Sequence, residues 1–198
     1  MDIYLLNDSG RTNSTFEEHK LLCKEIPEIL ESKYPEYYIK GSEGNGNRTS
    51  YPWICIMDKS ITRSPQKGLY VAILFQRNME GFYITLNQGI TYFKDTFKNK
   101  AYDRAQEAAS YFRKDIEIND AVDSIDLNSY KSDNGYGFEK TTVIGNYFKK
   151  GEYTKEKLYE VLKDYMDLYK EAIEMSSEEI YFDEDTYRIV FSINFFGT

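Results

Sequence analysis

Histidine and cysteine are scarce in this sequence of 198 residues, which has one histidine, His19, and two cysteines, Cys23 and Cys55. A single histidine, with no Gly-x-Ser-x-Gly turn, argues against Ser-His-Asp or Cys-His catalysis. His19 and Cys23 have the spacing of two zinc ligands on a helix, but nothing else completes such a site. Two distant cysteines make no disulfide framework. The sequence therefore indicates neither a histidine-based hydrolase nor a zinc protein.

Several other signatures are missing as well. No apolar run approaches the roughly 18 residues that cross a bilayer, and the N-terminal sequence lacks the pattern of a signal peptide. No P-loop is present, and no compact set of acids with a lysine suggests a nuclease, although a small Mg²⁺-dependent nuclease stays an alternative. We therefore expect a cytoplasmic protein without membrane contact, without a cofactor or metal, and without catalytic activity of its own.

Aromatic residues and a local basic segment are what the sequence does contain. Nineteen Tyr, twelve Phe and one Trp make up 16% of the chain, and such rings suit both cores and binding surfaces. The net charge of −8 argues against a nucleic-acid partner, and with the acidic stretch 177–185 it supports a protein-interaction domain as an alternative. Residues 40–77, however, hold six basic and two acidic residues, a net charge of +4. A basic face on an acidic body can still bind phosphate weakly.

The hydrophobic pattern predicts an α+β fold of one domain, with a mixed, mostly antiparallel central sheet flanked by helices. A capping box formed by Ser14 and Glu17 opens a first helix, in which Pro27 should cause a kink or a break. The chain divides into a domain of residues 1–175 and an extension, 176–198, that adds a strand. We expect helices at 14–33, 91–97, 102–114 and 154–175, strands at 37–40, 52–57, 68–76, 81–87, 141–148 and 187–196, and loops at 41–48, 58–67 and 119–137.

The most informative stretch lies between residues 38 and 91. It contains a Gly-x-Gly-Asn-x-Thr-Ser-x-Pro-Trp run at 44–53, a Gly-x-Tyr-x-x-x-Leu run at 68–74, and Leu-Asn-Gln-Gly-Ile-Thr at 86–91. The glycines permit close approach of backbone to DNA, and basic residues flank them. Thr49, Trp53, Tyr70 and Leu74 supply the hydroxyl, rings and aliphatic group that a base pocket needs. These motifs resemble the N-terminal DNA-binding domain of McrB-type restriction proteins.

The resemblance implies binding of duplex DNA that contains a methylated or hydroxymethylated cytosine, with the modified base flipped out of the helix into a pocket. Tyr70 would be one of two rings that sandwich the base, and Leu74 would line the pocket. Trp53 and Thr49 would contact the modified edge, with Cys55 close by. A Tyr-Gly pair at 136–137 makes Tyr136 the second ring, with Tyr130 as the alternative.

Other contacts to DNA follow from the same stretch. The family pattern has a tyrosine between the two loop glycines that fills the gap left in the duplex, and here this position is Asn45. Flipping would then use Asn45 or Arg48, or the domain reads another modification or unmodified DNA. The remaining expected contacts are Asn47 at the base, and Lys40, Lys59, Arg63 and Lys67 at phosphates.

The resemblance also implies partners. Family members usually continue into an AAA+ GTPase motor that recruits a nuclease, or into a nuclease domain. GTP and Mg²⁺ would belong to that motor and not to this chain. We therefore expect the recognition module of a type IV restriction system in phage defence.

Overall fold

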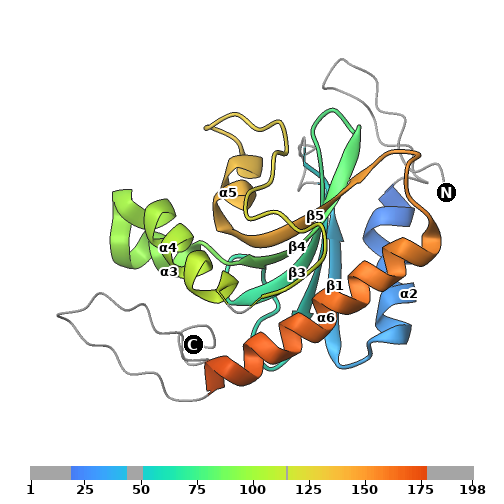
Figure 1. The fold of residues 1–198 in the computed structure, drawn as a ribbon, viewed down its shortest axis with the longest axis horizontal. Coiled ribbons are helices and arrows are strands. Elements are labelled where there is room, and N and C mark those ends of the chain that lie inside the picture. The colour runs from blue at the N-terminus through green and yellow to red at the C-terminus, as the bar shows by residue number, and fades with distance from the viewer. Residues whose placement is uncertain (1–18, 44–50, 115, 178–198) are drawn as a thin grey trace.

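The central element of the fold is a five-stranded sheet (Figure 1) in a computed structural model that describes residues 19–43, 51–114 and 116–177. Its strand order is β1-β2-β3-β4-β5, and every neighbouring pair is antiparallel. The strands are rich in Val, Ile and aromatic residues, which pack well on a pleated surface. Their bounds are Tyr37–Ser42 (β1), Trp53–Asp58 (β2), Leu69–Phe75 (β3), Gly81–Gln88 (β4) and Thr142–Lys149 (β5).

Helices surround this sheet. The long helix α6 crosses one side of the sheet, α2 lies near β1, and α3, α4 and α5 gather at the opposite end of the molecule (Figure 1). The helical elements are η1 (Leu21–Glu25), α2 (Ile26–Lys33), α3 (Thr91–Phe97), η2 (Lys98–Lys100), α4 (Ala101–Arg113), α5 (Asn134–Thr141) and α6 (Lys155–Ser177). The expected α+β fold, with a mostly antiparallel central sheet flanked by helices, is confirmed, and among the described strands all pairings are antiparallel. No helix in the described ranges is long and apolar enough to span a membrane.

The two faces of the sheet bury different sets of side chains, because successive residues of a strand point to opposite faces. One face packs against the apolar stripe of α6. Tyr169 of that helix donates a hydrogen bond to the carbonyl of Leu69 at 2.7 Å, and Tyr165 donates one to Asn146 at 2.9 Å. The second face is covered by the chain around Ile125 and Leu127 and by α5, and its cluster contains Tyr51, Cys55, Met57, Tyr70, Ala72, Leu74, Tyr83, Ile125 and Leu127. The sequence motifs of interest lie on this second face.

Two elements differ in detail from the sequence-based expectation. In place of the break expected at Pro27, a π-helical turn, η1, in which the Ile26 amide donates a hydrogen bond to the carbonyl of Leu21, continues directly into α2, which begins at Ile26 with Pro27 as its second residue. Proline has no amide hydrogen to donate, so the regular α-helical hydrogen bonding changes at this point while the backbone stays helical. Helix α5 occupies the end of the expected loop 119–137, because its packing on β4 and Tyr51 compensates for a polar, glycine-containing sequence. The expected strand 187–196 and the Ser14 cap lie outside the described residues.

Candidate functional site

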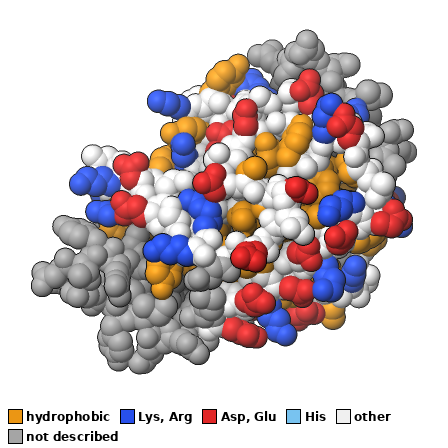
Figure 2. Space-filling model, viewed as in Figure 1, with side chains coloured by type: hydrophobic (Ala, Val, Ile, Leu, Met, Phe, Trp, Pro, Cys, Tyr) orange, Lys and Arg blue, Asp and Glu red, His pale blue; other side chains and the backbone are white. Residues whose placement is uncertain are grey.

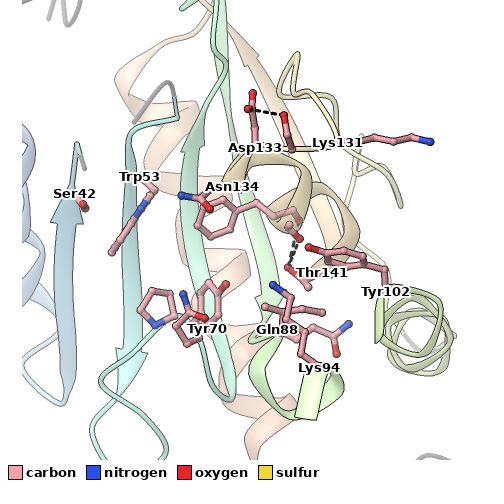
Figure 3. Close-up of a pocket in the computed structure, with 16 residues that line it drawn as sticks. Ser42, Trp53, Tyr70, Gln88, Lys94, Tyr102, Lys131, Asp133, Asn134 and Thr141 are labelled. Carbon is pink, nitrogen blue, oxygen red and sulfur yellow. Dashed lines mark hydrogen bonds between the residues drawn. The ribbon is translucent and has the colours of Figure 1, made fainter. Parts of the chain in front are cut away.

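A pocket of about 660 Å³ opens on the second face of the sheet (Figure 3). Its walls come from separate parts of the chain: the end of β1, the start of β2, β3, the end of β4, and helices α3, α4 and α5. A cavity of this size falls within the range of small-molecule sites. The lining residues are Ser42, Trp53, Pro65, Gln66, Tyr70, Gln88, Ile90, Lys94, Tyr102, Lys131, Ser132, Asp133, Asn134, Gly137, Phe138 and Thr141.

Four aromatic rings line the pocket, and they differ in how much of each is open. Trp53, Tyr102 and Phe138 are half-buried, so part of each ring can contact a ligand. Tyr70 is 1% exposed and belongs to the core of the second face. It rises from β3 between Trp53 and Gln88 in Figure 3. The pocket therefore has three accessible rings above a floor to which Tyr70 contributes.

The residues that the sequence predicts to contact the flipped DNA base differ in their distance from the pocket. Trp53 and Tyr70 both line the pocket. Cys55 and Leu74 are fully buried on the same face of the sheet, and Leu74 lies opposite Trp53 in the β2–β3 register. Tyr136 is not in the pocket wall but packs edge-on against Tyr102, with ring centroids 5.5 Å apart. Asn45, Asn47, Arg48 and Thr49 lie outside the described residues.

Of the basic residues expected at phosphates, Lys40 lies on β1, and the other three, Lys59, Arg63 and Lys67, lie between β2 and β3. Lys40 is exposed on β1, two residues before the pocket residue Ser42, and Lys67 follows the pocket residue Gln66. The Arg63 guanidinium lies 5.7 Å from the ring centre of Tyr38. Lys59 donates a hydrogen bond to the carbonyl of Pro35, at the end of the hairpin away from Trp53.

Several pocket residues were not identified from the sequence. Gln88 stands inside the Leu-Asn-Gln-Gly-Ile-Thr motif, which gave the one available signal. Most of the others lie on α3, α4 and α5 or beside them, and only tertiary packing brings these elements to the sheet. They include Lys94, Tyr102, Lys131, Asn134, Phe138 and Thr141.

Helix α5 is fixed to β4 by a buried polar network under the pocket. Asn87, fully buried, accepts a hydrogen bond from the Thr141 hydroxyl at 2.7 Å and donates one to Thr142 at 2.9 Å. The Thr142 hydroxyl donates to the carbonyl of Phe138 at 2.8 Å. Because both bonds of Asn87 are buried and the bond to the Phe138 carbonyl is partly buried, the network holds the Phe138 wall of the pocket in place.

A second contact ties the start of α5 to the start of β2. The Tyr51 hydroxyl donates a 2.7 Å hydrogen bond to Asp133, whose carboxylate also lies 3.4 Å from Arg77. Burial, followed by the bond to Asp133, raises the pKa of Tyr51 to about 12. The bond from Tyr51 is also the largest cause that lowers the pKa of Asp133. A β-carbon at Gly135 would lie 2.7 Å from the Tyr51 ring, so only glycine allows this close packing.

We expect Tyr51→Phe to lower the free energy of unfolding by about 1–2 kcal/mol near neutral pH, because Asp133 loses a hydrogen bond to a charged group. The stabilisation from a phenol whose pKa is raised on folding is complete below pH 10 and is lost as the pH rises through about 12. The variant should therefore lose less stability than the wild type between pH 10 and 12. Urea unfolding across this pH range measures the difference. Tyr130→Phe, at a ring that is 63% exposed, is the control and should follow the wild type.

The chemistry of the described residues does not suggest a metal site. Within the described part of the chain, no three His, Cys, Asp or Glu side chains lie close enough to hold a metal ion. The His19 Nδ1 lies 2.8 Å from a carboxylate oxygen of Glu43. Among the described residues, His19 and Cys23 are not part of a group that could hold a metal ion. Burial raises the pKa of the Cys23 and Cys55 thiols, which makes both poor thiolate donors.

Comparison with known families identifies the family to which the chain belongs. Residues 6–174 match the family described as "MrcB-like, N-terminal domain". A search of curated proteins found no match. The family match covers most of the 198 residues and includes every described element up to the last turn of α6. Together with the motifs at 44–53 and 68–74, it shows that the chain belongs to the MrcB-like N-terminal domain family, the McrB-type DNA-binding domains.

Proposed function

We propose that this domain binds duplex DNA that contains a modified cytosine and takes the modified base, flipped out of the helix, into the pocket beside Trp53. The observation that carries the proposal is a pocket of about 660 Å³ with Trp53, Tyr102 and Phe138 partly open in its walls. Family membership supports the DNA-binding context.

The energetics of flipping agree with such a pocket. Extruding a base from a duplex costs a few kcal/mol, and stacking on an aromatic ring returns about 1–3 kcal/mol per base. Three accessible rings provide the stacking surface, and apolar atoms of Trp53 can contact a 5-methyl group, as apolar side chains contact the methyl group of thymine. Tyr70, with Leu74 and Cys55 behind it, supports the pocket from the core.

The position of the pocket indicates the side from which DNA approaches. Ser42, at the end of β1, and Trp53, at the start of β2, are paired in the β1–β2 register, and both line the pocket. The segment 44–50, which connects the two strands, is therefore joined to the pocket wall at both of its ends. We therefore propose that Asn45, Asn47, Arg48 and Thr49 contact the DNA there. Tyr136 is proposed to act indirectly, by supporting the Tyr102 ring.

Charges around the pocket suit phosphate contacts of moderate strength. Lys94 and Lys131 line the pocket, Lys40 and Lys67 lie close to its lining residues, and Arg63 is exposed nearby in the chain. Lys59, whose amine donates a hydrogen bond to the carbonyl of Pro35, is not included in this interface. On the face shown in Figure 2, basic and acidic side chains are interspersed. We therefore expect weak, salt-sensitive binding to unmodified DNA, with the modified base providing the preference.

The test is binding at fixed salt to duplexes that differ only in one cytosine, 5-methylcytosine or 5-hydroxymethylcytosine. We expect tighter binding of at least one modified duplex, by about tenfold or more, together with a rise in fluorescence from 2-aminopurine beside the target base as stacking is lost. Equal affinity for all three duplexes would refute recognition of modified cytosine. Tight binding without a fluorescence change would refute flipping.

A second candidate is a module of the same fold that reads a different modification or unmodified DNA. The observation in its favour is Asn45, which replaces the ring expected between the loop glycines and cannot stack in the duplex. Binding to a panel of duplexes with other modified bases separates the two candidates. By family context, the proposed partner is an AAA+ GTPase motor that recruits a nuclease, or a nuclease that cleaves the DNA itself.

A further inference from the structure

The ring of Tyr130 is exposed beside the pocket and is supported from one side. It is 63% exposed, the largest exposed fraction among the described aromatic residues. The Arg77 guanidinium lies over the ring, 4.5 Å from its centre, and 3.4 Å from the Asp133 carboxylate. The backbone of Arg77 is fixed as well, because its amide donates a 3.0 Å hydrogen bond to the carbonyl of Leu127. One face of the Tyr130 ring is therefore covered by a cation that the fold holds in place, while most of the ring stays open.

The turn that begins at Tyr130 forms part of the pocket wall. The Asp133 amide donates a 2.8 Å hydrogen bond to the carbonyl of Tyr130, which closes the turn. The three residues that follow Tyr130, namely Lys131, Ser132 and Asp133, all line the pocket, whereas Tyr130 itself does not. The ring therefore stands at the rim of the pocket and not in its wall.

This rim belongs to the end of the pocket from which DNA is proposed to approach. The Tyr51 hydroxyl donates a 2.7 Å hydrogen bond to Asp133, so the turn is fixed to the chain just before β2. Two residues further on, Trp53 pairs with Ser42, and Figure 3 shows Asp133 at the same end of the pocket as these two residues. A duplex that delivers a base past Trp53 therefore comes within reach of the Tyr130 ring.

Extrusion of a base creates the partner surface for such a ring. The flipped base leaves a gap in the duplex, and the two neighbouring bases of its strand each lose a stacking partner. Every base has a π-face, so an aromatic side chain can stack there whatever the sequence. Arg77 and Lys131 are both exposed, and they supply positive charge for the phosphates on either side of the gap.

We propose that Tyr130, supported by Arg77, enters the gap left by the flipped base and stacks on a neighbouring base of the same strand. The ring acts in the duplex and not in the pocket, so its role differs from that of Trp53. This inference rests on the proposed function, since a gap forms only when a base is extruded.

The first measurement compares duplexes that have cytosine or 5-methylcytosine at the target position. We expect Tyr130→Ala to weaken binding of the 5-methylcytosine duplex by about 5- to 150-fold and to change binding of the unmodified duplex by about twofold or less. Tyr130→Phe keeps the ring and should bind both duplexes as the wild type does. Tyr111→Ala is the matched control, because Tyr111 is 45% exposed, has Lys114 over its ring at 5.6 Å and does not line the pocket. It should leave both affinities unchanged.

The second measurement separates stacking in the duplex from contact with the flipped base. The base on either side of 5-methylcytosine is replaced, one at a time, by an abasic site, which removes the surface on which Tyr130 would stack. On at least one of these two duplexes the effect of Tyr130→Ala should fall to about twofold or less, because side chain and base are then coupled. Trp53→Ala should keep its effect on both, since the flipped base is unchanged.

The outcomes separate this inference from the proposed function. Equal affinity of the wild type for the cytosine and 5-methylcytosine duplexes would refute the proposed function, and the role of Tyr130 with it. If the wild type prefers 5-methylcytosine but Tyr130→Ala binds equally well, the inference alone is overturned. The same conclusion follows if the effect of Tyr130→Ala persists on both abasic duplexes.

Discussion

Trp53→Ala is expected to weaken binding of the modified duplex by about 5- to 150-fold, with little change in binding of the unmodified duplex. The ring is half-buried, lies at the start of β2 and forms part of the pocket wall. Truncation of a ring that stacks on a base costs about 1–3 kcal/mol, and this loss falls only on the complex in which a base enters the pocket. Fluorescence anisotropy titrations with both duplexes at one salt concentration measure the two affinities.

Two variants make the Trp53 result interpretable. Trp53→Phe retains a smaller ring and should keep most of the preference. Tyr111→Ala removes a ring on α4 that is 45% exposed and does not line the pocket, so it should leave both affinities unchanged. If Trp53→Ala weakens both duplexes equally while Tyr111→Ala weakens neither, Trp53 contacts DNA outside a base pocket, and the proposed location of the base is wrong.

Tyr70→Ala is expected to lower the free energy of unfolding by about 3–5 kcal/mol, the usual range for truncation of a large buried ring. Tyr70 is 1% exposed and packs in the cluster with Cys55, Ala72 and Leu74. Since domains are stable by about 5–15 kcal/mol, this variant would retain only part of its stability. Urea unfolding followed by tryptophan fluorescence or circular dichroism measures the change. A loss below 1 kcal/mol would show that the ring is not part of the core.

Tyr70→Phe separates the structural role of the ring from its role in the pocket. The substitution keeps the ring and removes only the hydroxyl, whose pKa burial raises well above its ordinary value. We expect stability close to that of the wild type and retained preference for the modified duplex. A loss of preference in a stable Tyr70→Phe protein would instead assign the hydroxyl a direct contact with the base.

Local sequence patterns were sufficient to predict most of the secondary structure. The runs 52–57, 68–76 and 81–87 are largely apolar and rich in β-branched and aromatic residues, and they form β2, β3 and β4. The apolar stripe at 154–175 forms α6, whose first turn is capped by the Thr154 hydroxyl 3.2 Å from the Lys157 amide. These elements were predictable because propensity and hydrophobic period act between residues that are neighbours in the chain. Helix α5 was missed because its stability comes from packing and not from its own sequence.

The sequence by itself determined the α+β class, the family motifs and two of the pocket rings, Trp53 and Tyr70. Only the tertiary structure decided that Tyr102, Phe138 and Gln88 share this pocket, and that Tyr136 stands behind Tyr102 and outside the wall. It also decided that Leu74 and Cys55 are core residues. The physical reason is that a pocket depends on contacts between segments far apart in the chain, and their positions follow from strand register and helix packing, which no local pattern encodes.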